Sequence, residues 1–285
     1  MSAFNTPVLF VIFNRPDVTQ LVFNRIREVR PSRLYVAADG PRAGKPGEKE
    51  LCEKTRSIID TIDWPCEVKK LYRDANVGCG KAVSGAINWF FDQEEMGIIL
   101  EDDIMADLSF FSYCSELLER YKNDEKVMQI NGCNFQQGVN RSEGSYYFSA
   151  FPHVWGWASW RRAWKHYDFN LSDVNYFYND DKMDYYFTNK KIKRTWYEIF
   201  FKMNQKMIDT WDYQWNYAVW KNKGKVITPN TNLISNIGFG AEATHTFDNT
   251  SKFANNKTGS IDLIKHPSDL SINKEADLFT FVYCN

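Results

Sequence analysis

Short apolar runs alternate with stretches of helical periodicity along the first half of the chain. Uninterrupted apolar runs are typical of strands that are buried on both faces of a sheet. Apolar residues spaced three or four positions apart instead predict amphipathic helices. Strands are therefore expected at 8–13, 33–40, 66–74, 97–103 and 126–133, and helices at 18–29, 48–62, 81–93 and 107–122. This alternation predicts a doubly wound α/β sheet.

Acidic residues follow two of the predicted strands. Asp39 lies at the end of the second strand, and Glu101, Asp102 and Asp103 end the fourth. In α/β sheets, ligands bind beyond the carboxyl ends of the strands. A ligand site is therefore expected where Asp39 and the three consecutive acids, the acidic triplet, lie together.

The second half of the chain is richer in aromatic and basic residues. Residues 146–167 are crowded with aromatic side chains, and residues 182–206 carry seven Lys or Arg against two acids, a net charge of +5. A short amphipathic helix is predicted at 211–225 and a strand at 226–229.

Polar and glycine-rich segments complete the chain. A Gly-rich loop at 235–246 contains Glu242 and His245, and the tail 247–285 has one weak strand pattern at 279–284. Because no long linker interrupts the pattern, a single domain over residues 1–246 is expected, followed by this tail.

Composition narrows the classes of partner. The 285 residues include 35 Lys and Arg against 36 Asp and Glu, so no global field attracts nucleic acid. Six cysteines without metal-site or disulfide spacing indicate reduced thiols in a cytoplasmic protein. The ten Trp residues fit either a Trp-rich core or flat apolar faces for sugars, and both interpretations stay open.

The acidic triplet is the strongest local indication of chemistry. Adjacent carboxylates raise one another's pKa unless a cation lies between them. Mn²⁺ and Mg²⁺ use one or two protein carboxylates together with the oxygens of a diphosphate. The triplet therefore predicts a metal and diphosphate site, with a solvated acidic turn that caps the next helix as the alternative.

Two other segments are weaker candidates. The glycines of 76-NVGCG-80 permit close backbone approach to an anion at the following helix, and Lys81 adds a positive charge, although such loops are commonly simple turns. Asp212 lies in an aromatic setting that would raise its pKa toward that of a general base, or it is only an acid at a helix N-terminus.

The order of these motifs resembles a known family. The chain is similar to bacterial nucleotide-diphospho-sugar transferases with the GT-A fold, and more distantly to the N-acetylglucosaminyltransferase I group. The resemblance rests on 8-VLFVIFNRP-16, 36-VAADG-40, the 76–80 loop, 98-IILEDDI-104, 155-WGWASWRRAW-164, 211-WDYQW-215 and 238-GFGAEATHT-246. It implies a GT-A (Rossmann-like) doubly wound mixed sheet, with a nucleotide-sugar half at 7–135 and an aromatic-rich acceptor and catalytic half at 146–246.

The resemblance also implies roles for the triplet. Asp103 matches the acid that binds Mn²⁺ or Mg²⁺, and this ion holds the donor diphosphate. Asp102 matches the residue that contacts the donor ribose, and Glu101 the one near the donor sugar.

Further matches complete the implied site. Asp39 matches the acid that reads the uracil, and Arg15 a basic residue that contacts the donor. Trp157 matches an aromatic residue beside the sugars. Asp212 matches the catalytic base that deprotonates the acceptor hydroxyl, with Glu242 as the rival base.

The implied activity is an inverting, divalent-metal-dependent glycosyl transfer in cell-surface polysaccharide or glycan synthesis. A UDP-sugar, with N-acetylhexosamine among the candidate sugars, would react with a saccharide or lipid-linked saccharide acceptor. Two alternatives stay open: a sugar nucleotidyltransferase, although residues 13–17 lack the glycine of a triphosphate loop, and a non-catalytic carbohydrate-binding protein.

Residues 168–206 have no clear counterpart in the family and are expected to shape the acceptor site. Within them lies the basic and aromatic segment 182–206. Its positive charge fits either a flap over the active site or contact with an anionic membrane, and a solvated helix face is an equal alternative. The protein is therefore expected in the cytoplasm, with peripheral contact at the inner membrane as a further hypothesis.

Overall fold

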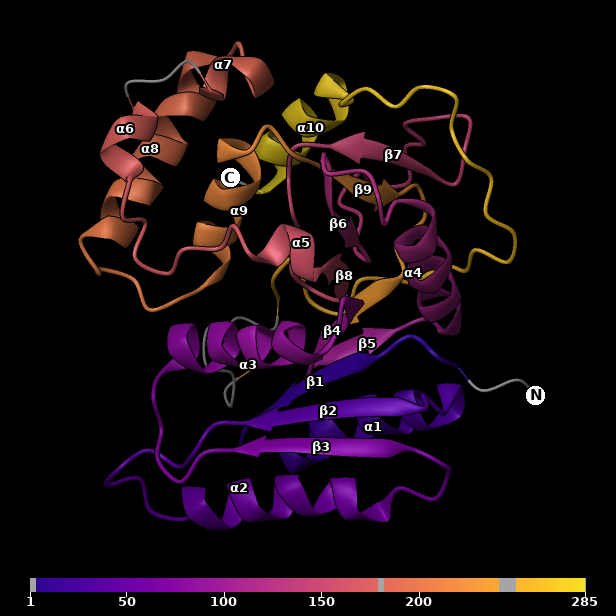
Figure 1. Cartoon of the computed structure of the whole chain (residues 1–285), viewed down its shortest axis with the longest axis vertical. Helices are drawn as coiled ribbons and strands as arrows, with labels where there is room; N and C mark the ends of the chain where they lie inside the picture. The colour runs from indigo at the N-terminus through magenta and orange to yellow at the C-terminus, as the bar shows by residue number, and fades with distance from the viewer. Residues whose placement is uncertain (1–3, 179–181, 241–249, 285) are drawn as a thin grey trace.

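The computed structural model describes residues 4–178, 182–240 and 250–284, which fold around a mixed β-sheet (Figure 1). Among these residues the sheet has eight strands in the order β3-β2-β1-β4-β8-β6-β9-β7. Its strands are β1 Val8–Ile12, β2 Arg33–Ala38, β3 Glu67–Tyr72, β4 Met96–Glu101, β6 Val127–Asn131, β7 Tyr146–Ser149, β8 Trp157–Trp160 and β9 Lys225–Pro229. Two short strands, β5 Ile104–Ala106 and β10 Ile234–Asn236, pair separately.

Strand direction divides the sheet into two parts. Strands β3, β2, β1 and β4 are parallel to one another. Strand β8 runs antiparallel to both β4 and β6, and β7 runs antiparallel to β9. The expected α/β class with a mixed sheet is confirmed.

Helices cover both faces of the parallel part. Helices α1 Pro16–Val29 and α4 Leu108–Arg120 contribute to the core on one face, and α3 Cys79–Gln93 contributes to the core on the other. Along β1 the side chains of Val8 and Phe10 enter the first core, whereas Leu9 enters the second. Because both faces are buried, β1 has no polar alternation, as the sequence predicted. Helix α2 Glu48–Ser57, followed by the 3₁₀ helix η1 Ile58–Thr61, packs beside α1.

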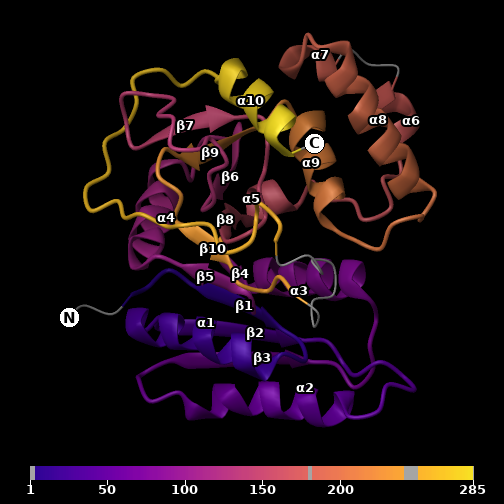
Figure 2. The ribbon, with the colours of Figure 1, turned by 180° about the vertical axis from the view of Figure 1, so that it is seen from behind.

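The second half of the chain adds a group of helices at the edge of the molecule near α3 (Figures 1 and 2). They are α6 Val174–Tyr178, α7 Lys182–Tyr186, α8 Lys190–Asn204 and α9 Asp212–Lys221. The short helix α5 Arg161–Trp164 lies closer to the centre and packs against α3, β6 and β8. The core of this part of the chain is aromatic: the rings of Trp157 and Trp211 stack at 5.8 Å, and those of Trp164 and Trp215 lie 5.0 Å apart. At these positions the Trp-rich core is the correct interpretation.

The end of the chain differs from its prediction. The strand expected at 279–284 is wrong, because α10 Lys274–Cys284 is a helix. Its buried Asp277 accepts hydrogen bonds from Ser149 Oγ at 2.6 Å and from the Ala150 backbone N–H at 3.0 Å. Burial raises the pKa of Asp277 to about 7. The helix is thus docked on the end of β7.

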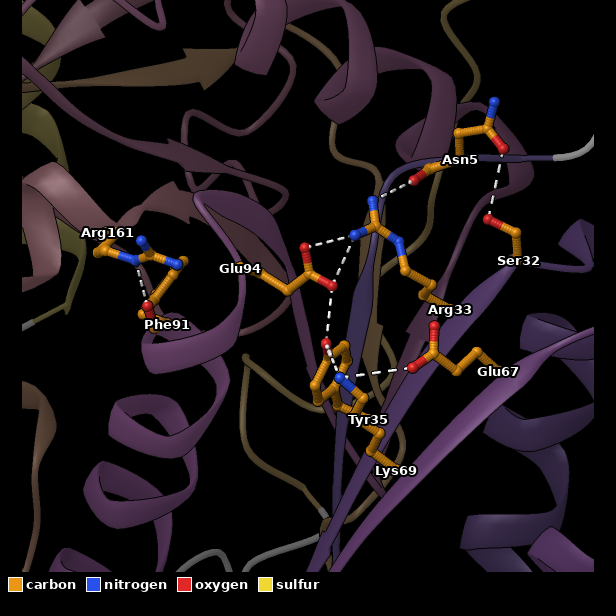
Figure 3. Close-up of polar contacts among 9 residues, drawn as sticks. All are labelled: Asn5, Ser32, Arg33, Tyr35, Glu67, Lys69, Phe91, Glu94 and Arg161. Carbon is orange, nitrogen blue, oxygen red and sulfur yellow. Dashed lines mark hydrogen bonds and ion pairs between the residues drawn. The ribbon is translucent and has the colours of Figure 1, made fainter.

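A buried carboxylate fixes α3 against the sheet (Figure 3). Glu94, the residue after α3, accepts hydrogen bonds from Arg33 Nη1 at 2.8 and 2.6 Å and from Tyr35 Oη at 2.7 Å. Both partners come from β2, so the C-terminal end of α3 is held in place. Its N-terminal end lies beside the candidate site. No helix among the described residues is long and apolar enough to cross a membrane.

Candidate active site

The acidic triplet lies where β4 ends, and Arg15 reaches it from the turn between β1 and α1. The Arg15 guanidinium pairs with Asp102 and, at 3.0 Å, with Oδ2 of Asp103. Asp102 also accepts a hydrogen bond from the Phe13 backbone N–H at 3.3 Å. One arginine therefore serves two adjacent carboxylates, which leaves Glu101 without an ion pair among the described residues.

Burial and neighbouring charges raise the pKa values of Glu101 and Asp102. Burial, together with the charges of Asp103 and Asp102, raises the pKa of Glu101 to about 8. Burial also raises the pKa of Asp102 to about 6, although the Arg15 charge opposes the rise. Burial is the largest cause of both shifts, and the neighbouring carboxylates add to it.

Asp39 joins two loops at the carboxyl ends of β2 and β3. Its Oδ1 accepts a hydrogen bond from the Gly40 backbone N–H at 2.9 Å, and its carboxylate accepts from the Val77 N–H at 3.1 and 3.2 Å. Burial raises the pKa of Asp39, while the hydrogen bonds from Val77 and Gly40 oppose the rise. The parallel strands thus bring Asp39 and the triplet to one edge, as expected.

The glycine-rich loop 76–80 forms the N-terminal end of α3, and an acid from elsewhere in the chain already contacts it. Oδ1 of Asp209 accepts a hydrogen bond from the Gly80 backbone N–H at 3.1 Å. A Cβ at Gly78 or at Gly80 would lie 2.7 Å from the same carboxylate. Glycine is therefore needed here for close approach of an anionic group, and that group is Asp209.

These residues enclose a cavity of about 330 Å³, called here the acidic cavity. Its charged lining residues are Arg15, Asp39, Arg42, Arg73, Glu101, Asp102, Asp103 and Asp209. Arg42 is paired with Glu48. Arg73 makes no side-chain hydrogen bond or ion pair with any described residue, so its guanidinium is available to an anionic ligand.

A second cavity of about 320 Å³, called here the aromatic cavity, adjoins the first. Trp155 lines both cavities. The wall of the aromatic cavity includes Phe135, Phe151, His153, Trp196, Tyr213, Phe253 and Phe281, together with Asp212. Burial lowers the pKa of His153 to about 4, so its imidazole is neutral at pH 7. The cavity thus combines flat apolar faces with a few polar groups, a composition suited to sugar rings.

Asp212 is the first residue of α9 and is half-buried. Its Oδ1 accepts a hydrogen bond from Thr210 Oγ1, which orients the carboxylate. Its charge is also one of the smaller contributions that raise the pKa of Glu101, after burial and the other triplet acids. Asp212 thus lines the aromatic cavity, whereas Asp209, three residues before it, lines the acidic one. Glu242 and His245 lie outside the described residues.

Two other predicted residues lie away from the cavities that the described residues form. Trp157 is fully buried in β8 and packs in the aromatic core, whereas Trp155 lines both cavities. Lys81 is exposed on the first turn of α3 and lines neither cavity.

The donor set at Asp103 fits a divalent ion that takes most of its ligands from a substrate. The side chain is 14% exposed, and its Oδ1 accepts no hydrogen bond from any described residue. No group of three or more His, Cys, Asp and Glu side chains in the described part of the chain is arranged to hold a metal by itself. A single carboxylate oxygen in a cavity lined by five acids and three arginines suits Mn²⁺ or Mg²⁺ with a bound diphosphate.

Gly238 lies directly against the same carboxylate. A Cβ at this position would lie 2.1 Å from Oδ2 of Asp103, so the backbone passes directly over the acid. Pairing of β10 with β5 brings this segment to the triplet.

Three of the lining residues that sequence reasoning missed are Arg73, Trp155 and Asp209. Arg73 follows β3 directly, so its position at a strand end was a usable signal. Trp155 is two residues before Trp157, but Gly156 between them has φ +60°, which breaks the simple alternation of a strand. Asp209 approaches Gly80 from 129 residues away, and no local pattern indicates this contact.

The chain matches no protein-family model, and no curated protein sequence is significantly similar to it. Solved structures are distantly similar to it. TarS residues 1–349 from S. aureus align with a TM-score of 0.43 and 12% identity, over 80% of this chain and 59% of that one. The inositol-1-phosphate CTP transferase from T. maritima aligns with a TM-score of 0.41 and 8% identity, over 80% and 86%.

The UTP-bound UGPase from Acinetobacter baumannii aligns with a TM-score of 0.36 and 9% identity, over 79% of this chain and 85% of that one. No family assignment follows from these distant similarities.

Proposed function

We propose that this protein is an inverting, divalent-metal-dependent glycosyltransferase that moves a sugar from a UDP-sugar to a saccharide acceptor. The observation that supports this most directly is the junction of two unlike cavities at Trp155. One cavity is lined by acids and arginines, and the other by aromatic side chains and Asp212. A charged donor and a largely apolar sugar face would occupy neighbouring cavities of this kind.

The acidic cavity is the proposed donor site. Asp39 and Asp102 would contact the uridine, and Arg73 would pair with the diphosphate. Asp103 would hold a Mn²⁺ or Mg²⁺ ion through its free Oδ1. When bound, such an ion stabilises the negative charge of the departing diphosphate as a Lewis acid.

The aromatic cavity is the proposed acceptor site. Trp155, at its boundary with the donor cavity, would place one ring face against a sugar. Neutral His153 would exchange hydrogen bonds with sugar hydroxyls without adding a charge.

Asp212 would act as the general base. As the acceptor oxygen bonds to the anomeric carbon, the bond from that carbon to the diphosphate oxygen breaks, and Asp212 takes the hydroxyl proton. The attack and departure occur on opposite faces, so the configuration inverts. Thr210 orients the carboxylate through its hydrogen bond to Oδ1.

The test is a transfer assay with the purified chain, Mn²⁺, a panel of UDP-sugars and saccharide acceptors. The proposal predicts UDP release coupled to a glycosylated product, and loss of both in Asp212→Asn. Asp92→Asn, at an exposed position of α3, is the matched control and should keep full turnover. Formation of pyrophosphate from UTP and a sugar phosphate, without glycosyl transfer, would instead identify a sugar nucleotidyltransferase. Saccharide binding without either reaction would identify a binding protein.

A further inference from the structure

Helix α8 has two unlike faces, and only one of them packs against the rest of the protein. Ile192, Trp196, Phe200 and Met203 are buried against the rest of the helical group. On the outer face Phe201 is 56% exposed, which is unusual for an aromatic side chain in a folded domain. Figures 1 and 2 both show α8 at the outer edge of the molecule.

Basic residues surround this exposed ring. A shallow open groove of about 620 Å³ on α8 is lined by Lys190, Lys193, Arg194, Tyr197, Glu198, Phe201 and Lys202. Four cations therefore face one carboxylate. Arg194 is already paired with Glu198, and Lys193 with Asp184. The ammonium groups of Lys190 and Lys202 have no ion pair with any described residue and stay available to an external anion.

Two further apolar side chains are exposed shortly after the end of α8. Met207 is 67% exposed and Ile208 is 38% exposed. The next residue is Asp209, which lines the acidic cavity and contacts the N-terminal end of α3. The outer face of α8 and residues 205–208, together called the α8 surface, thus reach the rim of the proposed donor site.

We propose that the α8 surface docks on an anionic lipid bilayer. Lysines on this surface are attracted to the negative potential of acidic phospholipids. Transfer of the Phe201, Met207 and Ile208 side chains from water to the boundary between headgroups and acyl chains is favourable. A nucleic-acid backbone offers no apolar region of this kind. The buried face of α8 stays in the protein core, so docking requires no unfolding.

The consequence for catalysis rests on the proposed function. Docking at 190–208 would bring the segment 209–212, with Asp209 and Asp212, close to the lipid headgroups. An acceptor saccharide carried on a membrane lipid would then be delivered to the aromatic cavity from the surface.

The experiment is co-sedimentation of the full chain with vesicles of phosphatidylcholine alone or mixed with phosphatidylglycerol. We expect binding only to the anionic vesicles and weakening as salt is raised. The test variant is Lys190→Gln with Lys191→Gln, Lys202→Gln and Lys206→Gln. Each lost lysine should weaken partitioning about fivefold, so the quadruple variant should lose at least a hundredfold.

The matched control removes the same charge elsewhere, through Lys45→Gln, Lys54→Gln, Lys257→Gln and Lys274→Gln, all at exposed positions. It should bind as the wild type does. Phe201→Ser should weaken vesicle binding with little change in its salt dependence. Equal binding by the two quadruple variants, or wild-type binding to a soluble anionic polymer but not to vesicles, would overturn the proposal. Vesicle binding needs no transfer reaction, so its failure is distinguishable from failure of the proposed function.

Discussion

Nη2 of Arg15 lies 3.0 Å from Oδ2 of Asp103, and the same nitrogen pairs with Asp102. The Arg15 side chain is 15% exposed, and those of Asp102 and Asp103 are 6% and 14% exposed. The ion pair therefore lies mostly out of water, where a carboxylate without a partner is costly. Arg15 is the protein's own counter-charge for two of the three triplet acids.

Replacement of Arg15 by alanine should destabilise the fold by about 3 kcal/mol, because it leaves two buried carboxylates without their cation. The measurement is urea denaturation at neutral pH with a metal chelator present. Arg27→Ala is the matched control, since Arg27 forms a surface ion pair with Asp63 in which both side chains are at least 41% exposed. This control should lose much less stability than Arg15→Ala, because exposed ion pairs contribute little to folding. Similar losses in the two variants would contradict the account of Arg15.

Stability should fall as the pH rises, and Glu101 should be a principal cause. The folded protein raises the pKa of this residue from 4.5 to about 8. A carboxyl group with a raised folded-state pKa contributes stability that is complete below its unfolded pKa and is lost as the pH passes through the folded value. With a metal chelator in the buffer, the free energy of unfolding of Glu101→Gln should therefore fall less than that of the wild type between about pH 4.5 and 8. The control is Glu50→Gln, at an exposed position. If the free energy of unfolding changes with pH in the same way for Glu101→Gln as for the wild type and this control, the assignment to Glu101 is wrong.

The parallel half of the sheet was predictable for a simple physical reason. Strands β1 and β4 are covered on both faces, and continuous burial produces the apolar runs that the sequence contains. Strands β7 and β8 were not predicted. Each has only four residues, all buried and largely aromatic, so neither shows the alternation or the long apolar run that marks a strand. The helix α10 was misread as a strand, since its short run of Phe, Val and Tyr matches strand propensity while tertiary contacts made it helical.

The site was predictable only in part. Parallel strands end at one edge, so Asp39 and the triplet were expected together and are found together. The place of Trp155 in the cavity depends on the backbone at Gly156, and that of Asp209 depends on a long-range contact. Neither is visible in a local pattern.

Asp209→Asn should bind UDP several-fold more tightly than the wild type. The carboxylate of Asp209 adds negative charge to the acidic cavity and already occupies the Gly80 N–H that a phosphate could use. Isothermal titration with UDP and Mn²⁺ measures the change, with Asp92→Asn as the control. Unchanged or weaker binding would show that Asp209 does not oppose the diphosphate.

Asp212→Asn should reduce turnover by a factor of about 10² to 10⁴, the usual contribution of a general base. Its affinity for UDP should stay the same, because Asp212 lines the aromatic cavity and not the acidic one. Glu242→Gln, the rival variant, should retain activity. If Glu242→Gln is inactive and Asp212→Asn is not, the base has been assigned to the wrong residue.

In the proposed donor site, Asp103 and a divalent ion together hold the UDP-sugar in the acidic cavity. The most direct measurement is the stability of the wild type and of Asp103→Asn with UDP, with and without Mn²⁺. A ligand at a hundredfold excess over its dissociation constant raises the free energy of unfolding by about 2.7 kcal/mol. The account predicts this gain for the wild type only when UDP and Mn²⁺ are both present, and its loss in Asp103→Asn. Equal stabilisation of both proteins, or stabilisation by UDP that does not depend on Mn²⁺, would contradict it.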